Sequence, residues 1–200
     1  MCFYFKLSKE AQSLKSRFNA KFDDEDFFVP SEYNGFSFPR TPVIANNACD
    51  AIQLFQWGLV PTWAKDLSIR QYTLNARIET IKQKPAFKNN INNRCLIIAD
   101  GFYEWQWLDQ KGKKKQKYLI SLQNEDIFTF AGLWGEWIDP KTGEIHKTYT
   151  LLTTEANELM SKIHNSKRRM PVIFTLDDAY LWLDGKNIIN KDIDLIALPV

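Results

Sequence analysis

Six short runs of β-branched and aromatic residues, separated by Gly, Pro, Asn or Asp, constrain the fold of this chain more than any other feature. Such runs are typical of strands. Most connections between them are too short for the helical crossover that a parallel strand pair needs. We therefore expect an α+β fold built on a strongly curved, largely antiparallel, barrel-like β-sheet with flanking helices. The predicted strands are PVIAN, IQLFQW, RCLIIA, KYLISL, IFTFAGLW and TYTLLTT.

Helical signals occur in three other segments. Ser8 and Thr154 are good N-cap residues at the start of two of them, and the third ends just before Gly185. The tract 23–42 contains three prolines and one glycine among five aromatic residues, and we interpret it as a partly buried loop. The predicted helices cover residues 8–18, 154–164 and 175–184.

Composition limits the possible functions. The chain has 200 residues, 44% of them apolar, which fits a single domain over 1–200 with a substantial core. A net charge of +2 is too small for bulk attraction to nucleic acid, so any such site must be a local patch. Three cysteines without a C-x-x-C pair and two histidines predict neither a disulfide framework nor a metal site. No membrane-length apolar stretch or signal peptide is evident, so we expect a cytoplasmic protein, nucleoid-associated if bacterial. We also assume a monomer without a cofactor.

Cysteine at position 2 offers unusual chemistry if Met1 is removed, because the mature chain then begins with an amine and a thiol on one residue. The amine can condense with an aldehyde to a Schiff base, and the thiol can close a five-membered thiazolidine ring. The reference pKa values of an α-amine, about 7.7 to 8.0, and of a thiol, about 8.5, make both nucleophiles accessible near neutral pH. Position alone favours a plainer interpretation of Cys2 as a small hydrophobe opening a strand.

Four further segments occur along the chain: WGLVPTWA at 57–64, LNARIET at 74–80, ADGFYEWQ at 99–106 and IHNSKRRMP at 163–171. With a cysteine at position 2, they resemble in type and order the SRAP family, the SOS response-associated peptidases also called abasic site processing proteins. The resemblance spans essentially the whole chain. It implies recognition of abasic sites in single-stranded DNA and a covalent cross-link through Cys2 that shields the lesion during repair. The catalytic residues it implies are Cys2, Asn75, Glu104 and His164.

Each implied residue has a chemical role and a plainer alternative. Glu104, between Tyr103 and Trp105, could relay protons if burial raises its pKa, or be an exposed strand carboxylate. Asn75 could hold the amine or a sugar oxygen, and it could also cap a helix. His164 titrates near physiological pH in its ordinary state and could protonate the opened sugar, or simply interact with a helix dipole.

DNA contacts are expected from residues that flank the catalytic set. Cationic side chains could each neutralise a backbone phosphate, with Arg77 the strongest candidate. Trp63, with Pro61 and the preceding Phe38 or Pro39, could stack or wedge against bases beside the lesion. The other candidate cations are Lys167, Arg168 and Arg169.

Two other groups of residues are interpreted as structural. The run KGKKKQK at 111–117 lies between two predicted strands and is better explained as a solvated hairpin turn than as a DNA site. Core packing is the preferred role of the remaining conspicuous tryptophans, Trp57, Trp105, Trp134 and Trp137.

The chain departs from the family pattern in two places, and two other functions remain open. Phe3 and Tyr4 stand where many relatives carry Gly and Arg, and the segment from His164 to Met170 is longer than usual. Cys2 could instead serve a cysteine-type peptidase, including one limited to self-processing, although no oxyanion hole is evident. The chain could also be a non-covalent module that binds single-stranded DNA.

Overall fold

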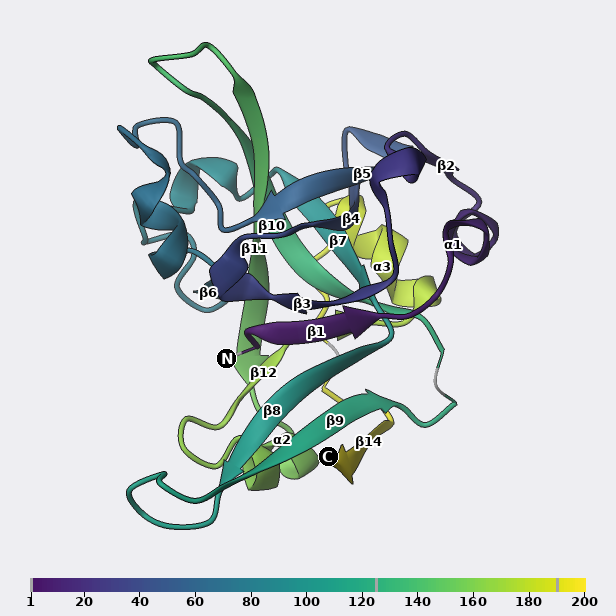
Figure 1. Ribbon diagram of the computed structural model, residues 1–200, viewed down its shortest axis with the longest axis vertical. Coiled ribbons are helices and arrows are strands. Elements are labelled where there is room, and N and C mark those ends of the chain that lie inside the picture. The colour runs from purple at the N-terminus through teal and green to yellow at the C-terminus, as the bar shows by residue number, and fades with distance from the viewer. Residues whose placement is uncertain (1, 125, 190) are drawn as a thin grey trace.

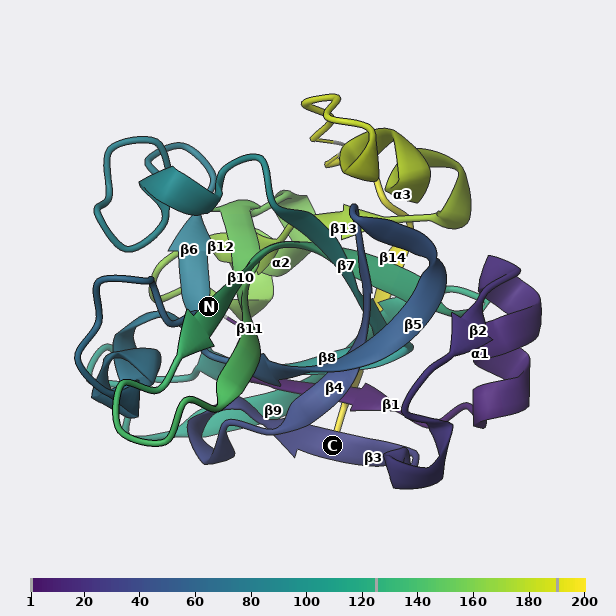
Figure 2. The same cartoon turned by 90° about the horizontal axis from the view of Figure 1, so that it is seen from above.

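The computed structural model describes residues 2–124, 126–189 and 191–200, and its centre is a closed β-barrel (Figures 1 and 2). Neighbouring strands of the barrel itself pair antiparallel except at one seam, where β5 and β11 run parallel and Trp57 lies opposite Tyr149. The predicted α+β, barrel-like and largely antiparallel fold is confirmed. The barrel strands are β4 (Arg40–Ala45), β5 (Ala48–Trp57), β7 (Arg94–Ala99), β10 (Phe128–Ile138) and β11 (Ile145–Glu155).

A second, fully antiparallel sheet lies against the barrel (Figure 1). The N-terminal strand β1 is an inner strand of this sheet, because it pairs with β3 on one side and β8 on the other. Pairing on both sides fixes the start of the chain in the structure. In spatial order the strands are β14 (Leu195–Pro199), β9 (Lys115–Leu122), β8 (Gly101–Trp107), β1 (Tyr4–Leu7) and β3 (Ser31–Asn34).

Short elements complete the fold at the barrel edges. Strand β6 runs parallel to β11 and places Asn75 opposite Leu151. Among the described residues, no helix combines the length and apolar character that crossing a membrane would require. These elements are β2 (Lys21–Phe22), β6 (Asn75–Arg77), β12 (Arg169–Pro171), β13 (Ile173–Phe174), α1 (Ala11–Phe18), α2 (Glu158–Ile163), α3 (Leu176–Leu183), and the 3-10 turns η1 (Glu25–Phe27), η2 (Gly35–Ser37), η3 (Leu67–Tyr72) and η4 (Lys88–Asn90).

Aromatic side chains join the barrel interior to the second sheet. Phe5 on β1 packs against Trp57 and Phe130, with ring centroids 5.1 and 5.7 Å away, and all three side chains are fully buried. Trp57 also stacks on Tyr149 across the parallel seam. Full burial of one such side chain stabilises the fold by roughly 1.5 to 3 kcal/mol. The core therefore holds β1, and with it the chain start, against the barrel.

Two predicted helices begin later than expected. Ser8 does not cap α1, because its backbone N–H and hydroxyl both donate to the Asp100 carboxylate, at 2.7 and 2.5 Å. Thr154 does not cap α2, because it still belongs to β11 and pairs with Met170. Asn157 caps α2 instead, and its side chain accepts a hydrogen bond from the Met160 N–H. The helix predicted at 175–184 is observed at Leu176–Leu183.

Two further sequence interpretations need correction. The tract 23–42 is not only loop, since it contains β3 and the start of β4. Trp57, Trp134 and Trp137 are buried as predicted, but Trp105 is only half-buried. Its strand lies in the second sheet, where the face away from the barrel remains partly open to solvent.

Candidate active site

Cys2 lies just before β1 and is completely buried. Its thiol donates to the Tyr4 carbonyl at 3.6 Å, and its own carbonyl accepts a hydrogen bond of 2.8 Å from the Asn75 side chain. Burial raises the pKa of the Cys2 thiol far above its ordinary range, and the nearby Glu104 carboxylate raises it further. The expectation of a thiol that ionises near neutral pH is therefore wrong for this buried state.

Asn75 opens strand β6, so its interpretation as a helix N-cap is wrong. Its amide nitrogen holds the Cys2 carbonyl, which links the chain start to the barrel through β6 and β11. Its side-chain oxygen is buried and has no hydrogen-bond partner in the described part of the chain. A buried acceptor without a donor is costly, which marks it as a position where a ligand or a processed terminus can bind.

Glu104 lies on β8 next to β1 and is only 5% exposed, so it is not an exposed strand carboxylate. Burial raises its pKa to about 7, as the proton-relay interpretation requires. Tyr103 and Trp105 face the opposite side of the strand from Glu104, because successive strand residues alternate in direction. The Lys117 ammonium lies over both of their rings, at 3.9 and 5.9 Å.

His164 follows the last residue of α2 and is 6% exposed. Its Nδ1 lies 2.8 Å from the Arg169 carbonyl and 3.2 Å from the Arg169 N–H, which fixes the imidazole in one orientation. Burial lowers the pKa of His164 to about 4. The expectation that it titrates near physiological pH is therefore wrong, and the imidazole is neutral at that pH.

The loop that carries His164 is attached to the same strand as Glu104. The Asn165 side chain accepts from the Trp107 N–H at 3.0 Å and donates to the Trp107 carbonyl at 2.9 Å. The Gln106 side chain adds a bond to the Lys162 carbonyl. Strand β8 thus positions Glu104 and His164 together, while Asn75 positions Cys2.

The cationic residues predicted for DNA binding divide into two groups. Arg77, Lys167 and Arg168 are exposed, and Arg77 lies two residues from Asn75 on β6. Arg169 is 7% exposed, forms a bidentate ion pair with Glu79 at 2.9 Å, and donates to the Thr153 carbonyl. This geometry does not support the phosphate contact expected of Arg169, because its guanidinium is buried and already bonded to Glu79 and Thr153.

The residues predicted to stack on bases also differ in solvent exposure. Trp63 is 54% exposed, and its indole N–H donates to the Pro85 carbonyl. Phe38 and Pro39 are half-buried, and the Arg70 guanidinium lies 4.5 Å from the centre of the Phe38 ring. Pro61 is buried and is not available as a wedge. Trp63 remains the residue best placed to stack on a base.

Sequence reasoning missed two contributors to this region. Glu79 lies in the same LNARIET segment as Asn75 and forms an ion pair with Arg169. The negative charge of Glu79 and the positive charge of the IHNSKRRMP segment could have predicted this pair. Phe36 is 52% exposed and its ring packs against Phe3 at 4.8 Å. Their contact places an aromatic pair directly after Cys2.

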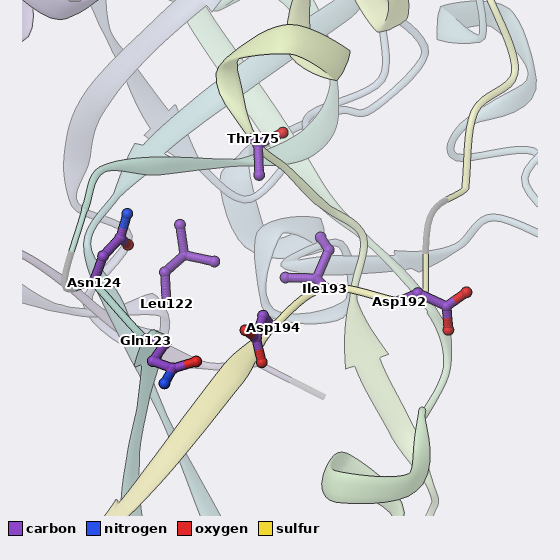
Figure 3. Close-up of a pocket in the computed structure, with 7 residues that line it drawn as sticks. All are labelled: Leu122, Gln123, Asn124, Thr175, Asp192, Ile193 and Asp194. Carbon is purple, nitrogen blue, oxygen red and sulfur yellow. The ribbon is translucent and has the colours of Figure 1, made fainter.

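An open surface cavity lies away from these residues. A surface pocket of about 520 Å³ lies between the end of β9, the start of α3 and the segment before β14 (Figure 3). Asp192 and Asp194 make its rim acidic, which disfavours a phosphate backbone. None of the four implied catalytic residues lines it. The described residues contain no cluster of histidine, cysteine and carboxylate side chains suited to a metal ion.

Comparisons with known proteins agree with the motifs. A family model described as SOS response associated peptidase (SRAP) matches residues 1–199. The abasic site processing protein YoqW of Bacillus subtilis (strain 168) is 38% identical over 94% of this chain and 82% of its own. The abasic site processing protein HMCES of Xenopus tropicalis is 32% identical over 88% of this chain and 60% of its own. A crystal structure of a Bacteroides thetaiotaomicron protein, 32% identical, has a TM-score of 0.87 and covers 100% of this chain and 92% of that one.

Proposed function

Because the chain belongs to the SOS response-associated peptidase (SRAP) family, we propose that it recognises abasic sites in single-stranded DNA and captures them covalently through Cys2 once Met1 is removed. Its relatives YoqW and HMCES are named abasic site processing proteins, which supports processing of such lesions in DNA repair. Met1 itself lies outside the described residues. The expected product is a protected lesion rather than a released one.

The reaction begins with attack of the Cys2 amine on the aldehyde of the ring-opened sugar. The resulting carbinolamine loses water to give an imine. The thiol then adds to the imine carbon, its proton passes to the nitrogen, and a five-membered thiazolidine closes. An abasic site has no base to extrude, so the usual cost of base flipping is reduced.

The placement of Glu104 beside Cys2 is the observation that carries this proposal. Carbinolamine formation and dehydration require a group that can both accept and donate a proton near neutral pH. A buried carboxyl with a pKa of about 7 does both, and it lies close enough to influence the ionisation of the Cys2 thiol.

Asn75 orients the amine of Cys2. Its amide nitrogen already holds the Cys2 carbonyl, and its buried oxygen has an unused acceptor site. A Cys2 ammonium created by removal of Met1 can donate to that oxygen. Asn75 would thereby aim the amine without itself titrating.

The buried thiol disfavours the peptidase alternative. A cysteine peptidase attacks as a thiolate, whereas burial and Glu104 both raise the pKa of the Cys2 thiol. Neutral His164 is bonded through Nδ1 to the Arg169 backbone. In the imine route the amine attacks first, so a protonated thiol is tolerated until ring closure.

Exposed stacking and cationic side chains support binding to single-stranded DNA. Trp63 is 54% exposed and could stack on a base, a contact that tolerates any base and is worth about 1 to 3 kcal/mol. Exposed Arg77, Lys167 and Arg168 can neutralise phosphates on either side of the lesion.

The test is to mix Met1-processed protein with a single-stranded oligonucleotide that contains one abasic site, and to analyse it by denaturing gel and intact mass. We expect a heat-stable adduct with the wild type and with Cys49→Ala, a matched variant that removes an exposed thiol. Cys2→Ala retains an N-terminal amine, so it should give only an imine that borohydride traps and heat reverses.

Other outcomes identify the alternatives. DNA binding without any adduct, trapped or untrapped, would replace the proposal with a non-covalent binding module. Peptide hydrolysis that persists while Met1 is retained would instead favour the peptidase. Either result contradicts covalent capture by the amine of Cys2.

A further inference from the structure

The hairpin between β8 and β9 concentrates positive charge beside the candidate active site. Residues 107–117 contain five lysines and one carboxylate, Asp109. Lys111, Lys113 and Lys114 are exposed at the tip of the hairpin. The net charge of the whole chain is only +2, so this hairpin holds a large share of its local positive potential.

The base of the hairpin is hydrogen-bonded to the loop that carries His164. Asn165 bonds both the N–H and the carbonyl of Trp107, and the next two exposed cations along that loop are Lys167 and Arg168. Figure 1 shows the hairpin tip projecting from the molecule next to this loop. The two segments together form one basic surface, which we define as Lys111, Lys113, Lys114, Lys167 and Arg168.

The hairpin tip is preorganised. The Asp109 carboxylate accepts hydrogen bonds from the backbone N–H groups of Lys111, Lys113 and Lys114, at 2.9, 3.0 and 2.6 Å. Gly112 has a φ of +62°, and a Cβ there would lie 2.6 Å from the Trp107 ring. The only carboxylate of the hairpin is thus used inside the turn, and the lysine side chains project from a fixed backbone.

We infer that this basic surface binds the DNA phosphate backbone on one side of the lesion, as an arm that extends the site formed by Cys2. This inference rests on the proposed function, because Cys2 fixes where the lesion lies. Trp107 is three residues beyond Glu104, about 10 Å at roughly 3.3 Å per strand residue, and the tip lies further still. The arm therefore contacts nucleotides beyond the lesion rather than the reacting sugar.

Phosphate is the partner that fits this surface. Lysine ammonium groups on a rigid turn bind phosphates as point charges without reading bases, which suits a protein that accepts any flanking sequence. The hairpin expected from the sequence is present, but its turn ends at Lys114, because Lys115–Lys117 already belong to β9. The hydrogen bonds to the His164 loop place the charge of this turn next to Lys167 and Arg168.

The experiment measures cross-linking rate against DNA concentration for the triple variant Lys111→Gln, Lys113→Gln, Lys114→Gln. Asp109 bonds the backbone of these residues, so the turn should keep its shape. We expect the half-saturating DNA concentration to rise on the order of tenfold at low salt, and the logarithmic salt slope to fall by about 2, at roughly 0.7 per phosphate contact. The maximal rate should not change.

The matched control is Lys21→Gln, Lys141→Gln, Lys186→Gln, which removes the same charge from exposed positions on other parts of the chain. The inference would be overturned if the hairpin variant kept the salt slope of the wild type. It would also be overturned if the control variant lost as much DNA affinity as the hairpin variant. Shortening the oligonucleotide on one side of the abasic site should weaken DNA binding by the wild type. It should leave the affinity of the hairpin variant unchanged. The same assay measures adduct formation by the wild type. A result against phosphate binding by the hairpin can therefore be distinguished from a result against covalent capture.

Discussion

Strand β8 joins two regions that differ in solvent exposure, charge and hydrogen bonding. Around Glu104 the side chains are buried, and desolvation moves the pKa of each ionisable group away from its ordinary value. At the hairpin tip, Lys111, Lys113 and Lys114 are exposed and the backbone is fixed by Asp109. Burial suits proton transfer, which depends on a tuned pKa, whereas exposure suits attraction of a polyanion.

This difference predicts how variants should behave. Substitutions in the buried region should change rate constants, pH dependence or stability, with effects of several kcal/mol. Substitutions in the exposed region should change affinity and salt dependence in small additive steps. A variant that mixed the two kinds of effect would show that the regions are not independent.

The largest effect is expected for Glu104→Gln, which keeps the shape of the side chain and removes its proton transfer. The maximal cross-linking rate should fall by roughly 10²- to 10⁴-fold, the usual contribution of general acid–base catalysis, while DNA affinity is retained. Single-turnover kinetics at saturating DNA measure this rate. A loss of affinity with an unchanged maximal rate would contradict the proton-relay role.

The pH dependence of the cross-linking rate identifies the group that titrates. Since burial raises the pKa of Glu104 to about 7, the wild-type rate should change its pH dependence near pH 7, and Glu104→Gln should remove that inflection. His164→Gln is the control, because the pKa of His164 is about 4 and its titration lies well below this range. Loss of the inflection in His164→Gln alone would assign the proton relay to the imidazole instead.

Glu104 also predicts a dependence of stability on pH. Its folded pKa of about 7 exceeds the ordinary value of about 4.3 for an unfolded chain, so the folded state keeps its proton to higher pH. Stability therefore falls as pH rises between these values, by on the order of 3 kcal/mol above pH 7. Glu104→Gln should unfold at higher urea than wild type at pH 8 and at similar urea at pH 4. A destabilised variant at pH 8 would contradict the burial penalty.

A smaller loss of stability is expected at Arg169. Removing one member of a buried ion pair costs about 3 to 5 kcal/mol, and we expect about 2 kcal/mol here because Glu79 is 41% exposed. Arg169→Gln should lower the free energy of unfolding measured in urea, and Glu79→Gln should add little in the double variant because the pair is already broken. Additive losses would show that the two residues do not act as a pair.

The sequence predicted the barrel strands because their apolar runs are long and their breaks are clear. It missed β3 because Ser31–Asn34 carries one buried apolar residue, Tyr33, among polar ones and follows a proline. The cap at Ser8 failed for a different reason. Its hydroxyl is bonded to Asp100, 92 positions away, and no local pattern reveals such a partner.

The candidate site was predictable as a set of residue types but not as a set of ionisation states. The motifs pointed to Glu104 and His164, but their pKa values move in opposite ways, upward for the carboxyl and downward for the imidazole. Both shifts come mainly from burial, which always penalises the charged form and therefore has opposite signs for an acid and a base. Burial is a property of the assembled fold, so the sequence alone could not supply it.

The smallest effect is expected from Arg168→Gln, which tests the comparison at adjacent residues. Arg168 is exposed while Arg169 is buried, although the sequence makes them look equivalent. The Arg168 variant should unfold within about 0.5 kcal/mol of wild type, as exposed substitutions usually do. Its salt slope for DNA binding should fall by about 0.7, the value for one phosphate contact on a single strand. An unchanged slope would remove Arg168 from the basic surface and leave Lys167 as its only member outside the hairpin.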